Sequence, residues 1–336
     1  MKTDDLEIKI PKRLIAKEPA YPRESARLMV VKKNIKKIED SFFFDIDKYF
    51  KGGDVLVFNR SKVFPARAFA KTKSGKKIEI LFLREESPKT WSVMIGGRTR
   101  DGERVKFNSK FKGIIEKGDQ CQISVNLNKE SVLKYLNKHG EMPLPPYIKR
   151  KATPKDKIEY QNIFADTLGS AAAPTAGLHF SKKLLKKINQ KGVNIVYVTL
   201  HVGLGTFLPI KNERVEDHQI HSEYFEIDKK TADLINSAKK EGRRIIACGT
   251  TSLRALESAT INGKLKPTKS FTDIYIYPGY QFKIIDGLIT NFHTPRSTLL
   301  ALVYAFGGQD LMKGAYQEAV KKNYRFFSYG DGMIIF

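Results

Sequence analysis

The carboxyl-terminal half of the chain alternates between two hydrophobic periodicities, one helical and one typical of buried strands. Residues 181–192, "SKKLLKKINQKG", carry apolar residues at helical spacing, with Ser181 placed as N-cap and Gly192 near the end of the helix. The β-branched run "VNIVYVTL" at 193–200 follows and predicts a buried strand. The same alternation predicts helices at 229–244, 251–259, 297–308 and about 312–323, and strands at 245–249, 272–277 and 287–292. We therefore expect an α/β fold, with a mixed sheet covered by helices.

A different pattern occupies residues 66–147. It begins after a buried strand, "DVLVF" at 54–58, and the polar turn "NRSKVFPAR". Glycine-containing turns separate short alternating or β-branched runs, namely "KKIEILFL", "TWSVMI", "ERVKF", "FKGIIEKG" and "CQISVNL". A helix at about 129–138 and the stiff "GEMPLPPYIKR" close the segment. We predict an α/β catalytic domain of residues 1–65 and 148–336, into which a small antiparallel β-barrel domain, 66–147, is inserted.

Length and composition limit the class of protein. At 336 residues the chain exceeds a usual single-domain core. No stretch approaches the roughly twenty apolar residues that would span a bilayer. The first residues lack the apolar segment of a signal peptide, so we expect a cytoplasmic protein with no membrane partner. Cys121 and Cys248 are far apart, which argues against a disulfide framework and against a cysteine-based zinc site.

The charge of the chain indicates the class of partner. Sixty Lys and Arg against 36 Asp and Glu leave a net charge of +24. Residues 66–155 hold 21 of these basic residues and only 9 acidic ones, so half of the excess lies in about a quarter of the chain. A solvated lysine-rich surface would explain this. A polyanionic partner would explain it too, because phosphates neutralised by Lys or Arg release counterions. We expect nucleic acid, held in part by the barrel.

The segment "HVGLGTF" at 201–207 raises three possibilities: a phosphate cradle, a metal ligand or the floor of a substrate pocket. It lacks the third glycine and the following helix of a dinucleotide-binding turn. The glycines can instead admit close approach of a ligand to the backbone, or mark a β-bulge, and the sequence leaves both open.

Five of the six histidines fall in the α/β region beside small or polar residues, where α/β folds build their sites: His179, His201, His218, His221 and His293. The segment "HQIHSE" at 218–223, together with His201, contains the ligand types of a catalytic zinc site. Its two histidines, however, would point to opposite faces of an extended segment, and no H-E-x-x-H pattern occurs. We therefore expect no metal, and imidazoles that bond to substrate or backbone.

Ten unusual blocks occur in order along the chain. They are "PAYPRESARL", "VFNRSKVFPAR", "GEMPLPPYIKR", "DKIEYQNIFA", "GSAAAPTAGLHF", "VTLHVGLGTFLPI", "HQIHSEYFEI", "GTTSLRALES", "TDIYIYPGYQFKIIDGLITNFHTPRSTLLALVYAFGG" and "YRFFSYGDGMII". Together they resemble the S-adenosylmethionine:tRNA ribosyltransferase-isomerase family of queuosine biosynthesis, from the amino-terminal segment to the last strand. Arg60 departs from the acidic or amide residue usual there, which puts a catalytic role for that position in doubt. Glu24 stands where the family often has Asp.

The resemblance implies an enzyme that uses S-adenosylmethionine as a ribosyl donor, with an α/β domain interrupted by a β-barrel. Its partner would be tRNA that carries 7-aminomethyl-7-deazaguanine at the wobble position. The product would be epoxyqueuosine-tRNA, with release of adenine and methionine. We expect a monomer.

This chemistry needs a base near the 5′ carbon of the donor and an acid near the departing adenine. We expect His179, His201 and Glu223 to surround the reacting ribosyl, with His221 and His293 as further catalytic candidates. Which residue is the base and which is the acid stays open. Replacing Glu223 by Gln is expected to abolish turnover while the fold stays intact.

Substrate binding involves a larger set of residues. Backbone and hydroxyl contacts are expected from Thr175, Gly177, Gly203, Gly205 and Thr206. Arg254, on a helix that opens at "GTTS", could bind the carboxylate of the donor. Asp273, Asp286 and Asp331 could accept hydrogen bonds from the aminomethyl cation or from a purine edge. Tyr280 and Tyr329, each beside a glycine, are expected to be exposed for stacking. Basic residues within the blocks are expected to contact RNA: Arg23, Arg27, Lys62, Arg67, Lys149 and Arg150.

Overall fold

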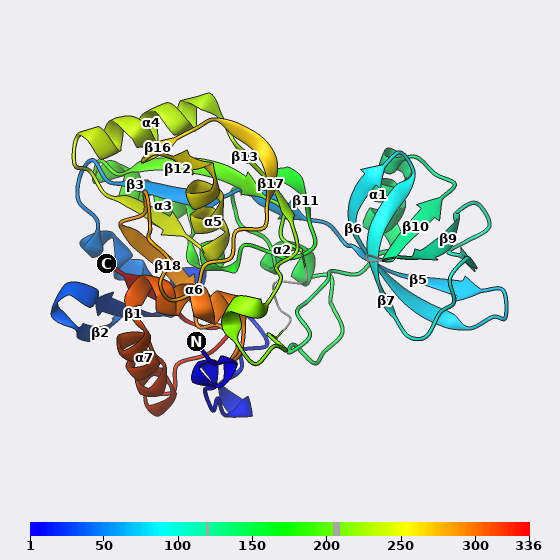
Figure 1. Ribbon diagram of the computed structural model, residues 1–336, viewed down its shortest axis with the longest axis horizontal. Helices are drawn as coiled ribbons and strands as arrows, with labels where there is room; N and C mark the ends of the chain where they lie inside the picture. Colours follow the sequence, from blue (N-terminus) through cyan, green and yellow to red (C-terminus); the bar gives the residue numbers. More distant parts are fainter. Residues whose placement is uncertain (119–120, 204–208) are drawn as a thin grey trace.

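The computed structural model describes residues 1–118, 121–203 and 209–336. Within them, a mixed nine-stranded sheet forms the body of the molecule and a closed β-barrel stands at one side (Figure 1). The strands of the sheet, in spatial order, are β17 (Thr268–Thr272), β13 (Glu223–Ile227), β12 (Asn194–Leu200), β3 (Val55–Asn59), β14 (Ile245–Cys248), β18 (Gly287–Asn291), β19 (Gly332–Ile335), β1 (Arg27–Lys32) and β2 (Lys37–Phe42). The predicted mixed sheet is confirmed.

The centre of the sheet is parallel and buried on both faces. Strands β12, β3, β14 and β18 run parallel, and β13 and β19 pair with them in the antiparallel sense. Successive side chains of a strand point to opposite faces. Accordingly, Val55 and Val57 of β3 pack into one hydrophobic core, whereas Leu56 and Phe58 pack into a second core on the other face. Burial on both faces is why the strand reads as a continuous apolar run.

Helices cover both faces of this sheet. They are α3 (Lys182–Gln190), α4 (Lys229–Lys240), α5 (Thr250–Ala259), α6 (Thr298–Gly307) and α7 (Gln309–Lys321). Of the other described α-helices, α1 (Lys129–His139) lies with the β-barrel in Figure 1, and α2 (Asp156–Glu159) is a single short turn. Apolar side chains of α4 to α7 belong to the core of Val55, whereas Leu184 and Ile188 of α3 belong to the core of Leu56. The predicted N-cap is confirmed, because the Ser181 hydroxyl accepts a hydrogen bond from the Leu184 N–H at 3.1 Å. No described helix is both long and apolar enough to span a bilayer.

The barrel is a separate antiparallel structure. Its strands, in spatial order, are β10 (Cys121–Val125), β7 (Thr90–Gly96), β6 (Lys77–Ser87), β5 (Arg67–Thr72), β8 (Glu103–Lys106) and β9 (Lys112–Lys117). Ile80, Phe82 and Ile115 are fully buried among its apolar side chains. Closure leaves no free sheet edge. The predicted barrel is confirmed, although β5 was not among the predicted runs.

Two short pairs of strands lie outside the nine-stranded sheet and the barrel. The predicted strand at 272–277 is wrong. The pairs are β4 (Ser61–Val63) with β11 (Thr167–Ser170), and β15 (Thr260–Ile261) with β16 (Lys264–Leu265). Strand β17 ends at Thr272, and 273–277 contains no strand. The Ile274 N–H bonds to the Thr272 hydroxyl at 3.1 Å, and the Ile274 carbonyl accepts from Arg254 at 3.2 Å. The polar backbone groups of Ile274 are therefore engaged outside any sheet.

Candidate active site

A cavity of ≈ 460 Å³ lies at the carboxyl end of the parallel strands. Open α/β sheets bind ligands at this edge, and a volume within roughly 300–1,000 Å³ is typical of small-molecule sites. The α/β domain contributes 201–203 after β12, the segment 218–224, Arg254 of α5 and the segment 274–276. The barrel contributes 83–84 and 92–95 to the opposite wall. The cavity is therefore enclosed by both parts of the molecule.

His201 enters the cavity directly after β12. Its Nδ1 lies 2.8 Å from the Ser61 hydroxyl, and its ring stacks on that of Tyr224 with centroids 5.6 Å apart. Burial, reinforced by the positive charge of Lys129, lowers the pKa of His201 to about 4. The imidazole is therefore neutral at physiological pH.

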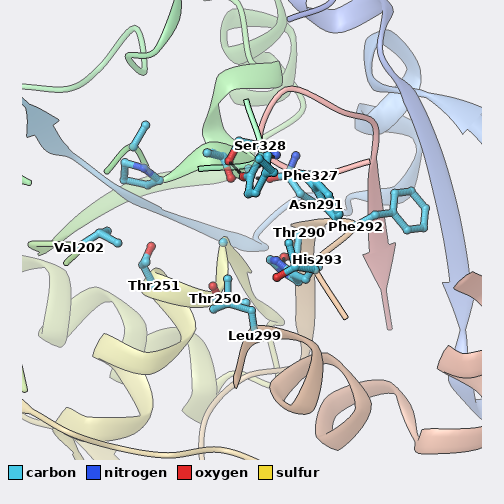
Figure 2. A pocket seen from close by; sticks show the side chains of 17 residues that line it. Val202, Thr250, Thr251, Thr290, Asn291, Phe292, His293, Leu299, Phe327 and Ser328 are labelled. Carbon is cyan, nitrogen blue, oxygen red and sulfur yellow. Dashed lines mark hydrogen bonds between the residues drawn. The ribbon is translucent and has the colours of Figure 1, made fainter. Parts of the chain in front are cut away.

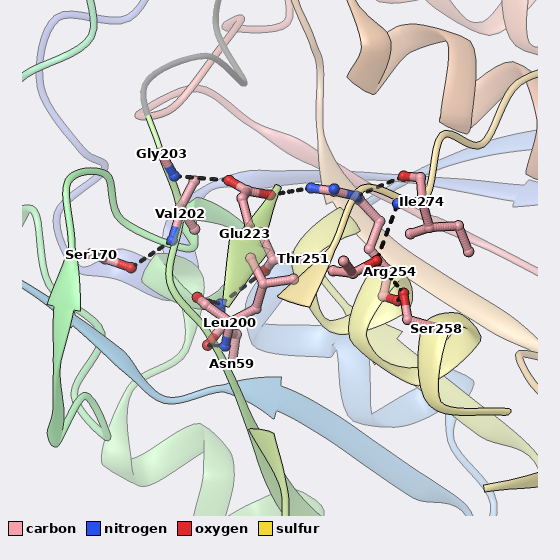
Figure 3. A network of polar contacts seen from close by, with 11 residues as sticks. Asn59, Ser170, Leu200, Val202, Gly203, Glu223, Thr251, Arg254, Ser258 and Ile274 are labelled. Atoms are coloured by element: carbon pink, nitrogen blue, oxygen red, sulfur yellow. Dashed lines mark hydrogen bonds and ion pairs between the residues drawn. The ribbon is translucent and has the colours of Figure 1, made fainter. Parts of the chain in front are cut away.

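A buried ion pair forms the next part of the wall (Figure 3). The Glu223 carboxylate accepts a hydrogen bond from the Gly203 N–H at 2.8 Å and a second one from Nη1 of Arg254. Only 6% of each of the two charged side chains is exposed. Arg254 also donates from Nε to the Ile274 carbonyl. Its Nη2 is buried and has no partner among the residues that the structure describes.

Tyr275 supplies a second unpartnered polar atom beside the same cavity. Its hydroxyl oxygen is buried, and no described residue bonds to it. Burial raises the pKa of Tyr275, so the hydroxyl keeps its proton and can donate. Buried polar atoms without partners are rare in folded proteins. Residues Arg254 and Tyr275 both line this cavity, so both atoms are available to a polar ligand there.

His218 and His221 line the cavity next to Glu223. His218 packs edge-to-face on Tyr275, with ring centroids 5.9 Å apart, and burial lowers its pKa. Among the described residues, no group of three His, Cys, Asp or Glu side chains is arranged to hold a metal ion.

Comparison with known proteins decides the family. A family model described as "Queuosine biosynthesis protein" matches residues 3–335. The chain belongs to this family. Similar curated proteins from Halothermothrix orenii and Aquifex aeolicus are 48% and 44% identical to it, over 100% of both chains in each case. Both are named S-adenosylmethionine:tRNA ribosyltransferase-isomerase.

A solved structure agrees with this assignment. The crystal structure of S-adenosylmethionine tRNA ribosyltransferase from Thermotoga maritima is 32% identical, covers 99% of this chain and 100% of that one, and has a TM-score of 0.59. The resemblance seen in the sequence is confirmed. The chain is an enzyme of the ribosyltransferase-isomerase family and serves tRNA modification in queuosine biosynthesis.

Two of the predicted catalytic histidines of this family member lie outside the large cavity. His179 stacks on Phe43 with centroids 4.0 Å apart and bonds to the Asn291 side chain at 3.1 Å. His293 bonds to the Thr290 hydroxyl at 2.8 Å. Burial lowers the pKa of each imidazole to about 3.

His293 lines a smaller cavity of ≈ 40 Å³ (Figure 2). A water molecule needs roughly 10–15 Å³ of cavity space, so this cavity fits a few waters and not a nucleoside. Val202 and Leu299 line both cavities and form the wall between them. Thr175 lies at the small cavity, where its hydroxyl donates to the Asn291 side chain at 2.8 Å.

The other predicted substrate-binding residues are scattered. Gly203 and Arg254 line the large cavity, and Gly177 packs against Asn162. The Tyr280 hydroxyl donates to Glu257, and Asp273 is exposed. Gly205 and Thr206 lie outside the described residues.

Tyr329 and Asp331 are both buried. The predicted exposure of Tyr329 is wrong: it is 1% exposed and donates to Asp156 at 3.2 Å. Asp331 accepts from the backbone N–H groups of Arg27 and Arg325. Both residues thus hold the carboxyl-terminal segment in place.

The predicted RNA-binding residues divide into two groups. Lys62 and Lys149 are exposed. The four arginines have partners within the protein: Arg23 the Gln161 carbonyl, Arg27 the Lys322 carbonyl, Arg67 the Glu79 carboxylate and Arg150 the Asp156 carboxylate.

Arg60, the departure from the family pattern, lines neither cavity. It donates to the Thr199 hydroxyl at 3.4 Å and lies 3.8 Å from the Asp166 carboxylate.

Sequence reasoning missed several residues of the site. Asn59 joins three elements, because its side chain bonds to the backbone of Leu200 and Ser61 and to the Thr251 hydroxyl. Its place directly after a buried strand was an available signal. Nothing in the pattern distinguished Tyr275 from the aromatic residues of the core.

Gly169 creates the space that the His201 ring occupies. It lies in a register irregularity of β11 at φ +154°, and an added Cβ would come within 2.6 Å of the imidazole. We expect Gly169→Ala to displace the ring and lower turnover at least ~10-fold, because a misplacement of about 1 Å in a site can cost on the order of 100-fold. Adenine release measures the effect.

Gly314→Ala is the matched control for this change. Gly314 lies in α7, where an added Cβ would meet no atom within 4 Å. Turnover should stay unchanged and stability should rise slightly. Equal turnover of the two variants would contradict the proposed contact.

Proposed function

We propose that this enzyme transfers and isomerises the ribosyl moiety of S-adenosylmethionine onto 7-aminomethyl-7-deazaguanine at the tRNA wobble position. The products are epoxyqueuosine-tRNA, adenine and methionine. The observation that carries the proposal is the ≈ 460 Å³ cavity, which is lined by two unpartnered polar groups, on Arg254 and Tyr275, and by the neutral imidazole of His201. Family membership supports S-adenosylmethionine as the ribosyl donor and tRNA as the acceptor.

Arg254 is suited to bind the methionine carboxylate of the donor. Its guanidinium is held at Nη1 by Glu223 and at Nε by the Ile274 carbonyl, which fixes the plane of the group. The remaining Nη2 is free to donate, and charge-assisted bonds from arginine to carboxylate are strong and directional. The Tyr275 hydroxyl, next to Ile274 in the chain, provides a second donor.

Of the predicted catalytic residues, we propose that His201, Glu223 and His221 surround the reacting ribosyl. All three line the large cavity. The Glu223 carboxylate is fixed by Gly203 and Arg254 and offers negative charge near the sulfonium of the donor. His179 and His293 would instead hold the end of β18, next to the wall formed by Val202 and Leu299.

The barrel domain, which we assign to residues 66–147, supplies the opposite wall and much of the positive charge that attracts tRNA. Arg84 lines the cavity, and the positive charge of Lys129 reaches His201. Lys62 and Lys149 are exposed and free to contact phosphates. We propose a cytoplasmic location, which a tRNA substrate supports, and the expected monomer stays a prediction.

The test is an assay of adenine release. The purified protein is incubated with S-adenosylmethionine and tRNA that carries the aminomethyl-deazaguanine base, with and without EDTA, and products are separated by chromatography. Adenine and methionine should appear together, only with the modified tRNA, and equally in EDTA. Salt-sensitive tRNA binding without adenine under both conditions would identify an RNA-binding protein instead. Loss of activity only in EDTA would indicate a metal enzyme.

A further inference from the structure

We propose that Ser61 and Ser170 fix the tautomer of His201 so that its Nε2–H donates a hydrogen bond to the substrate. In the reaction, His201 then acts as a hydrogen-bond donor and not as the base. The inference deepens the proposed function and rests on it, because the acceptor belongs to the ribosyl donor.

A chain of short hydrogen bonds connects the backbone to the imidazole. The Val202 N–H donates to Oγ of Ser170 at 2.9 Å. Oγ of Ser170 lies 2.6 Å from Oγ of Ser61, which lies 2.8 Å from Nδ1 of His201. Both serines have no exposed surface, so bulk water does not reach them. Among the described residues, neither hydroxyl has any other acceptor for its proton.

The number of protons available determines which group donates in each of these hydrogen bonds. Ser170 already accepts from Val202, and the only described acceptor for its own proton is Ser61. Ser61 must then donate to Nδ1 of His201, which leaves the imidazole proton on Nε2. In the reverse order, the Ser170 proton would lack an acceptor in a site closed to water, which carries the full desolvation penalty of an unmade hydrogen bond. The first arrangement is therefore favoured.

Asn59 holds this chain in position. Its side-chain oxygen accepts from the backbone N–H groups of Ser61 and Leu200, which fixes the end of β3 against the end of β12. Ser61 and His201, 140 positions apart in the chain, are thereby brought within hydrogen-bond distance.

The opposite edge of the imidazole is open to ligand. Nε2 has no hydrogen-bond partner among the described residues, and the imidazole lines the large cavity. Gly169 packs against the Cε1 and Nε2 end of the ring and brings no side chain to it. Burial and the nearby charges of Lys129 and Arg84 disfavour the imidazolium, against the opposing charge of Glu226, and this lowers the pKa of His201 to about 4. A neutral N–H suits a lone pair of the adenosine moiety, on a ring nitrogen of the departing adenine or a ribose oxygen, where negative charge develops.

Nitrogen-15 NMR of histidine-labelled protein tests the tautomer directly. The His201 signals are assigned by their loss in His201→Gln. At pH 7 we expect a protonated Nε2 and an unprotonated Nδ1, and we expect Ser61→Ala to give a mixture of tautomers. A protonated Nδ1 in the unmodified protein would overturn the proposal. Because the measurement needs no turnover, it stands or fails separately from the proposed function.

Adenine release then tests the role of His201 as a hydrogen-bond donor. Glutamine keeps an N–H donor but cannot act as a base near neutral pH. We expect His201→Ala to lower kcat by about 100- to 1,000-fold, as loss of one such donor does, and His201→Gln to retain at least about ten times the kcat of His201→Ala. Equal loss in the two variants would assign the base to His201 and reject the donor role.

Discussion

Arg254→Gln should lower the free energy of unfolding by about 3–5 kcal/mol and abolish adenine release. The change leaves the Glu223 carboxylate buried without its cation, and breaking a buried ion pair from one side has a cost of this size. Turnover should be lost because the carboxylate of S-adenosylmethionine no longer has Nη2 of Arg254 to bond to. Denaturant unfolding measures the first effect, and chromatography of adenine at a temperature where the variant is folded measures the second.

A double variant separates stability from activity. Glu223→Leu combined with Arg254→Met removes both charges, so most of the lost stability should return while adenine release stays absent. A loss below about 1 kcal/mol in Arg254→Gln would contradict the ion pair. Adenine release near that of the unmodified protein in the double variant would contradict the assigned role of Arg254. The ion pair also changes the expectation for Glu223→Gln, which the sequence alone predicted would leave the fold intact. Arg254 would then be buried without its anion, so we expect this variant to be less stable.

Asn59→Ala should lower the free energy of unfolding by about 2–4 kcal/mol and lower turnover more than stability alone explains. The Asn59 side chain is buried, and without it the N–H groups of Ser61 and Leu200 lose their acceptor, at a cost of roughly 1–3 kcal/mol each. The displaced Ser61 would then no longer orient His201.

Asn137→Ala is the control for this change. Asn137 is exposed on α1, so its replacement should shift stability by no more than about 0.5 kcal/mol. An equally small shift in Asn59→Ala would show that the four hydrogen bonds of Asn59 contribute little. Thermal and denaturant unfolding, with adenine release measured on folded protein, distinguish these outcomes.

Local patterns in the sequence were sufficient to predict most of the elements. Apolar spacing of 3.6 and 2 residues, with an N-cap at Ser181, predicted α3 and β12, because these signals act within one turn or one strand. Glycine-containing turns between short runs predicted the barrel. The strand at 272–277 failed, since the polar backbone groups of Ile274 bond to Thr272 and to Arg254 of a distant helix. The residue pattern within one segment cannot predict a hydrogen bond to a residue of a distant helix.

The sequence by itself determined the family, the α/β sheet with its inserted barrel, and the excess of positive charge. Only the tertiary structure decided which of the predicted residues share one cavity. It brings His201 and Glu223 to the large cavity, buries Tyr329, and separates His179 and His293 from the space that a nucleoside would fill. The physical reason is that element type depends on neighbours in the chain, whereas a site depends on contacts such as those of Ser61 with His201, 140 positions away, and Glu223 with Arg254, 31 positions away. Those contacts form only when the sheet orders its strands.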